Sequence, residues 1–123
     1  MVSLNSCYFT AISKSGTKAA WIEFLTNNKS WIEMSHSIKT AGVFLTSGGK
    51  TKHLTLPARW DGSAVSGGVL ESVVIDVVPG STVWNTLKKA TLLEAKFNNL
   101  EYRANLTAED TADINESMRK IFE

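Results

Sequence analysis

The segment from Thr91 to Leu106 limits the possible folds of this chain more than any other. If Asn98-Asn99 forms a two-residue turn, one face of the resulting hairpin is apolar, with the pairs Phe97–Leu100, Ala95–Tyr102, Leu93–Ala104 and Thr91–Leu106. The other face pairs opposite charges, Lys96 with Glu101 and Glu94 with Arg103. A shift of one residue would exchange the two faces, so the pattern predicts an antiparallel hairpin in a single register.

A second hairpin is predicted around Gly48-Gly49, because glycine adopts the positive φ of a tight turn without a steric clash. One face of this hairpin carries the pairs Val43–Leu54 and Ala41–Leu56, and the other carries Phe44–His53 and Thr46–Thr51. Further strands are expected at residues 7–13, 18–25, 31–38 and 69–78.

Two helices are expected in the C-terminal third. Ser81 is a suitable N-cap for a short helix over residues 82–90, and Thr107 for a helix over residues 108–122. The second helix carries one apolar stripe, formed by Ile114, Met118, Ile121 and Phe122. The sequence therefore predicts one α+β domain over residues 1–123: a mostly antiparallel, curved β-sheet of about 7–8 short strands, with a short helix near 81–90 and a C-terminal helix near 108–122.

Composition excludes several classes of protein. With 43% hydrophobic residues and a net charge of +1, the chain is not of the disordered type, and no apolar run is long enough for a membrane helix. The first residues lack the basic and apolar regions of a signal peptide, so a cytoplasmic location is expected. Cys7 is the single cysteine, which excludes an internal disulfide and a cysteine-based metal site.

Charge is distributed unevenly along the chain. Residues 1–61 carry seven basic against three acidic residues, a net +4, and residues 62–123 carry six against nine, a net −3. Most of the N-terminal lysines fall in predicted turns, and a nucleic-acid binder would be more basic overall, so nucleic acid is not expected as a partner. The asymmetry is compatible with head-to-tail contact between copies.

The C-terminal order of elements, from the strand with Ile75-Asp76 through the short helix and the charged-faced hairpin to the closing helix, resembles small bacterial accessory proteins of the invasion-locus type. The likeness covers about half of the chain and includes no catalytic motif. Those proteins carry cysteines that are missing here, so no residue role is transferred.

Nothing in the sequence has the spacing of a known catalytic motif, and no enzyme activity, cofactor or metal is expected. Ser66-Gly67-Gly68 precedes a strand rather than a helix, which favours a flexible turn over a phosphate loop. His36 is expected to be half-buried in a strand, and His53 to be more exposed and within reach of Asp61. Asp76, which interrupts the apolar run from Val73 to Val78, is expected to face solvent. The alternative is a desolvated carboxylate with a raised pKa, unless Arg59 or a lysine pairs with it.

The predicted binding site lies in residues 57–68, which show neither strand nor helix periodicity and are interpreted as a long loop. Trp60 is the proposed apolar anchor, with Arg59 and Asp61 as its polar rim, because tryptophan and arginine are enriched at interface hot spots. The competing interpretation is that Trp60 plugs one end of the sheet while Arg59 and Asp61 pair on the surface. The expected function is non-catalytic binding of a protein partner or of a second copy, as in a homodimer.

Two alternatives remain open at this point. A small-molecule carrier would hold an apolar ligand in a cavity lined by aromatic residues such as Trp84, Phe97, Tyr102 and Phe122. A weak single-stranded nucleic-acid binder would stack bases on Trp21 and Trp31 beside the N-terminal lysines. A free sheet edge near residues 31–46 would also permit dimerisation by strand pairing.

Overall fold

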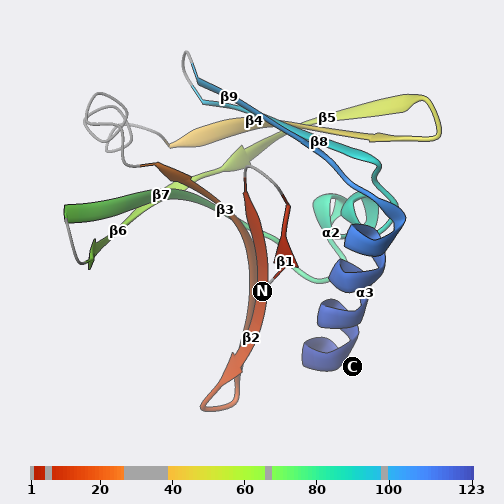
Figure 1. The fold of residues 1–123 in the computed structure, drawn as a ribbon. Coiled ribbons are helices and arrows are strands. Elements are labelled where there is room, and N and C mark those ends of the chain that lie inside the picture. Colours follow the sequence, from red (N-terminus) through yellow and green to blue (C-terminus); the bar gives the residue numbers. More distant parts are fainter. Residues whose placement is uncertain (1, 5–6, 27–38, 66–67, 98–99) are drawn as a thin grey trace.

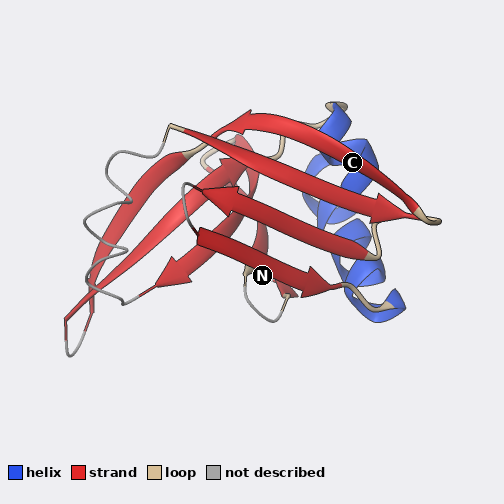
Figure 2. Cartoon of the chain, turned by 90° about the horizontal axis from the view of Figure 1, so that it is seen from above, coloured by secondary structure: helices blue, strands red, loops and turns tan. Residues whose placement is uncertain are grey.

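The computed structural model describes residues 2–4, 7–26, 39–65, 68–97 and 100–123. Its strands form two antiparallel sheets (Figures 1 and 2). The five-stranded sheet has the order β1 (Val2–Ser3), β2 (Tyr8–Lys14), β3 (Thr17–Thr26), β7 (Gly68–Asp76) and β6 (Arg59–Val65). The four-stranded sheet has the order β5 (Lys50–Pro57), β4 (Thr40–Ser47), β8 (Leu92–Phe97) and β9 (Leu100–Asn105). With helices α2 (Thr82–Leu87) and α3 (Ala108–Phe122), this confirms the predicted α+β class with curved antiparallel strands.

Both predicted hairpins form in the expected registers. In β4–β5, Gly48 and Gly49 have φ angles of 59° and 79°, which are the positive values that the tight turn requires. Val43 is opposite Leu54 and Phe44 is opposite His53, as the alternation predicts. In β8–β9, Phe97 pairs with Leu100, Ala95 with Tyr102 and Lys96 with Glu101.

The helices begin at the predicted caps. The Ser81 hydroxyl accepts a hydrogen bond from the Trp84 amide at 3.2 Å, although α2 ends at Leu87 and so is shorter than expected. At the start of α3, the Thr107 hydroxyl accepts from the Asp110 amide at 3.1 Å, and the Asp110 carboxylate accepts from the Thr107 amide at 2.9 Å. This reciprocal capping box satisfies two backbone groups that the helix itself leaves unpaired.

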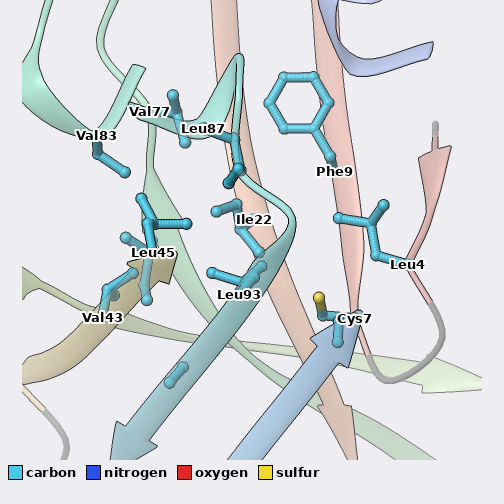
Figure 3. Close-up of a cluster of buried hydrophobic side chains, with 14 of the residues drawn as sticks. Leu4, Cys7, Phe9, Ile22, Val43, Leu45, Val77, Val83, Leu87 and Leu93 are labelled. Atoms are coloured by element: carbon cyan, nitrogen blue, oxygen red, sulfur yellow. The ribbon is translucent and has the colours of Figure 1, made fainter. Parts of the chain in front are cut away.

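One hydrophobic cluster joins both sheets and both helices (Figure 3). It includes, among others, Phe9, Ile22, Val43, Leu45, Ile75, Leu87, Leu93, Ile114 and Met118. The apolar positions of the two sheets therefore face one another and the helices, which leaves each sheet with an outer face.

One sequence-based expectation is corrected. The segment 57–68, predicted as a loop, contains β6, which pairs with β7 from Arg59–Val74 to Val65–Gly68. Pairing with a neighbouring strand has overridden the weak local pattern of this segment. The predicted strand at 31–38 lies outside the described residues.

Candidate functional site

The five-stranded sheet has a buried inner face and an outer face that the helices do not cover. Inward positions of β2, β3 and β7, such as Phe9, Ile22 and Ile75, are fully buried. Helix α3 packs against β2 and β3 on this inner side (Figure 1). Because side chains alternate along a strand, the intervening residues of these three strands form the outer face.

One row of that outer face is apolar. Ile12 is opposite Ala19 across β2 and β3. The Val77 amide donates to the Ala20 carbonyl at 2.9 Å, which continues the β3–β7 pairing beyond the end of β7 and brings Val78 beside Ala19. Ile12 and Val78 are 40% and 59% exposed, and they are the two large exposed hydrophobic side chains of the described chain. We call Ile12, Ala19 and Val78 the apolar row.

A shallow hollow of about 300 Å³ adjoins this row between β3 and the segment that follows β7. Its lining consists of Lys18, Ala19, Ala20, Asp76, Val77, Val78 and Pro79. Two members of the apolar row, Ala19 and Val78, therefore border a depression, and Ile12 lies outside its lining.

The next row of the outer face contains Thr10, Trp21 and Asp76, which are aligned across β2, β3 and β7. Trp21 is half-buried, and its indole Nε1–H donates to Glu23 Oε1 at 3.3 Å. Thr10 is 9% exposed, and its hydroxyl has no hydrogen-bond partner in the described chain. A buried hydroxyl without a hydrogen-bond partner lowers the free energy of unfolding, so the Thr10 hydroxyl destabilises the folded chain.

Arg59 completes the polar side of this surface. Its Nη2 lies 3.2 Å from Oδ1 of Asp76, and its Nε donates to Oδ2 of the same carboxylate at 3.4 Å. The two side chains are 53% and 58% exposed, so their pairing adds little to folding stability. The two contacts orient the guanidinium beside the row that contains Trp21. Asp76 thus faces solvent as predicted, and Arg59 bonds to Asp76.

The three predicted site residues occupy different faces of β6. Arg59 is in register with Val74, Trp60 with Val73 and Asp61 with Ser72. Adjacent strand positions alternate, so positions 59 and 61 share one face and position 60 belongs to the other. For Trp60 and Asp61, the structure describes only the backbone. The three residues lie in a strand rather than in the predicted loop, and this strand places Arg59 on the outer face of the sheet.

Sequence reasoning missed the apolar row. Ile12 was assigned to a strand, and Val78 to the end of another, but nothing local shows that β3 lies between them. A signal was present in the alternation, because Phe9 and Ala11 define an inward face and Ile12 then falls on the outward one. The row becomes visible only when β2, β3 and β7 are known to be neighbours.

The reactive side chains of Cys7 and His53 do not belong to this surface. Burial raises the pKa of the Cys7 thiol to about 12, so this cysteine stays protonated and behaves as a small hydrophobic residue. His53 stacks on Phe44, with ring centroids 4.3 Å apart and an interplanar angle of 3°. His36 lies outside the described residues, and the described part of the chain contains no group of three His, Cys, Asp or Glu residues suited to a metal ion.

The aromatic residues expected to line a carrier cavity pack against one another in two separate groups. Phe97 contacts Phe24 and Tyr102 at centroid distances of 5.1 and 5.9 Å. Trp84 contacts Phe122 at 5.2 Å, edge to face. Because these rings fill the space between one another, they give no support to the proposed ligand cavity of a carrier protein.

The nucleic-acid alternative also gains no support. Trp21 is bonded to the Glu23 carboxylate, which would repel a phosphate backbone, and Trp31 is not among the described residues. Among the described helices, none is long and apolar enough to cross a membrane.

Comparison of the chain with protein-family models, with curated proteins and with solved structures finds no match.

Proposed function

We propose that this chain is a non-catalytic interaction domain that pairs with a second copy of itself through the outer face of the five-stranded sheet. The observation that supports the proposal is the apolar row: both large exposed hydrophobic side chains of the described chain, Ile12 and Val78, lie on it. Apolar side chains gathered on one exposed surface are typical of contact sites, whereas isolated ones need no explanation.

The surroundings of the row have the composition of an interface. Half-buried Trp21 lies next to it, and the Arg59–Asp76 pair forms a polar border, so aromatic and arginine side chains flank an apolar centre. Burial of Ile12 and Val78 in a contact would remove apolar area from water, which favours association.

Charge is the reason for choosing a second copy as the partner. The outer face carries basic Lys14 and Arg59 together with acidic Glu23 and Asp76, so neither sign dominates. A surface that contains both signs is complementary to itself across a two-fold axis, where Arg59 of one copy can meet Asp76 of the other. The hollow beside Val78 would receive Ile12 from the second copy.

Binding, rather than catalysis, is also what the reactive groups favour. The Cys7 thiol is buried and protonated, and His53 is held against Phe44 with no described carboxylate bonded to it. Neither residue forms the bonded pair of nucleophile and base that covalent catalysis requires.

The test is the mass of the full chain in solution, measured by light scattering across a range of concentrations, for the native sequence and for Val78→Lys. We expect a concentration-dependent dimer whose dissociation constant rises at least about tenfold in the variant, because two charges would be buried at the centre of the contact. Thr55→Lys is the matched control, since it adds the same charge at an exposed position of β5 on the other sheet. A native chain that stays monomeric at every concentration, or equal effects of the two variants, would contradict the proposal.

A further inference from the structure

A basic groove lies at the opposite end of the molecule from the five-stranded sheet's outer face. The β4–β5 hairpin extends beyond the core and passes over α2 (Figures 1 and 2). The groove between them has a volume of about 400 Å³, and it is lined by Leu45, Ser47, Lys50, Thr51, Lys52, Thr86 and Lys89.

The hairpin register and the end of α2 bring the three lysines together. Lys52 is opposite buried Leu45, and Lys50 is opposite Ser47, so alternation places both on the side of β5 that continues the inner face. Lys89 is the second residue after Leu87, where α2 ends, and it lines the same groove. Residues far apart in the sequence therefore contribute three ammonium groups to one concave surface.

Among the described residues that line this groove, none is acidic. Within the described chain, Lys50, Lys52 and Lys89 take part in none of the ion pairs, which join Arg59 to Asp76, Lys96 to Glu101 and Lys120 to Glu116. An anion that entered the groove would be attracted by all three ammonium groups.

The acidic hollow next to α3 provides a contrast. It is lined in part by Asp110, Asp113 and Glu116. Asp110 accepts the capping hydrogen bond of Thr107, and Glu116 pairs with Lys120 at 3.3 Å, so two of its three carboxylates already have partners. The lysines of the basic groove form no such ion pair in the described chain, so their charges, unlike those of the acidic hollow, are not engaged by carboxylates.

The hydroxyl groups that line the groove differ in whether they already form a hydrogen bond within the protein. Thr86 donates its hydroxyl to the Thr82 carbonyl at 2.7 Å, and Thr51 shares a hydrogen bond with Thr46 at 2.8 Å. The Ser47 hydroxyl has no hydrogen-bond partner in the described chain and remains available as a donor. Three ammonium groups and one hydroxyl thus converge as donors above the apolar floor made by Leu45.

We propose that the groove binds a small ligand that carries two or more linked phosphate groups. Lysine ammonium groups bind phosphate oxygens as compact point charges, and several of them around one concave surface suit a ligand that carries several negative charges. Three positive charges match a polyphosphate better than a single phosphate ester, which carries up to about two negative charges. The volume lies in the range of small-molecule sites, and the groove is bounded by α2 on one side, which favours a short ligand over a nucleic-acid strand.

The experiment is a titration of the full chain with sodium tripolyphosphate at low ionic strength, followed by amide chemical shifts. We expect shifts concentrated at Ser47, Lys50, Lys52 and Lys89, and a dissociation constant that rises about tenfold in Lys52→Met and in Lys89→Met. Both lysines are on the surface, so the variants should keep the amide spectrum of the folded chain outside the groove. Lys120→Met, which removes the same charge from α3, should leave the affinity unchanged.

Three results would overturn the inference. The first is the absence of shifts at low ionic strength, where screening is weakest. The second is an equal loss of affinity in Lys120→Met, which would assign binding to overall charge. The third is tighter binding of a single-stranded oligonucleotide than of tripolyphosphate through the same lysines, which would assign the groove to nucleic acid.

Discussion

The outer faces of the two sheets differ in how far their side chains satisfy one another. On the four-stranded sheet, Lys96 pairs with Glu101 at 3.6 Å, and the Thr46 and Thr51 hydroxyls share a hydrogen bond. Phe44 lies between the His53 ring and the Lys96 ammonium, whose Nζ is 5.2 Å from the Phe44 centroid. On the five-stranded sheet, Ile12 and Val78 are exposed and have no equivalent cover.

This difference indicates which face is built for solvent. A face whose charges, hydroxyls and rings pair across the strands gains nothing further from a partner. A face that leaves apolar side chains in water gains free energy when a partner covers them. The comparison therefore favours the five-stranded sheet, rather than the four-stranded one, as the surface for the proposed association.

The largest expected change in the free energy of unfolding comes from comparing a residue on the inner side of the five-stranded sheet with one on its outer side. Ile22→Ala should lower the free energy of unfolding by about 3 kcal/mol, because it opens a cavity at a fully buried position. Ile12→Ala should change it by less than about 1 kcal/mol, since this side chain is 40% exposed. Urea unfolding of both variants measures the difference, and similar losses would show that Ile12 serves the fold.

A smaller change in the free energy of unfolding, this time an increase, is expected for a substitution at Thr10. Thr10→Val keeps the shape of the side chain and removes a buried hydroxyl that has no partner in the described chain, so the free energy of unfolding should rise by about 1 kcal/mol. Thermal unfolding of the two proteins provides the measurement. A loss of stability would mean that the hydroxyl is hydrogen-bonded after all.

The smallest effect is expected on the four-stranded face. Lys96→Glu places like charges opposite each other at the Glu101 position, which should cost about 0.5 kcal/mol at low salt and less at high salt. The dimer dissociation constant should stay unchanged. If this variant weakened association, the assignment of the contact to the other sheet would be wrong.

How much of the fold could be predicted depended on whether the pairing was local. The β8–β9 register followed from the sequence because one face of the hairpin is apolar and the other pairs opposite charges, so only one alignment satisfies both. Ser81 and Thr107 were found for the same reason, because a helix cap acts over a few residues.

The pairings between distant segments could not be predicted in this way. The stretch Arg59–Val65 has no clear alternation, and it becomes a strand through its contact with β7. Thr10, Trp21 and Asp76 are likewise brought together by the strand order, which no local pattern encodes. The candidate surface consists of such non-local neighbours, which is why Arg59 was identified but Ile12 and Val78 were not.

The most direct test of the account is the concentration dependence of side-chain methyl signals in the native chain. As the protein is concentrated, the methyl groups of Ile12 and Val78 should shift together and along one binding curve, while those of Thr46 and Thr51 on the four-stranded sheet should stay in place. Shifts confined to the four-stranded face, or no shift at Ile12 and Val78 while the chain dimerises, would contradict the assignment of the contact to the five-stranded sheet.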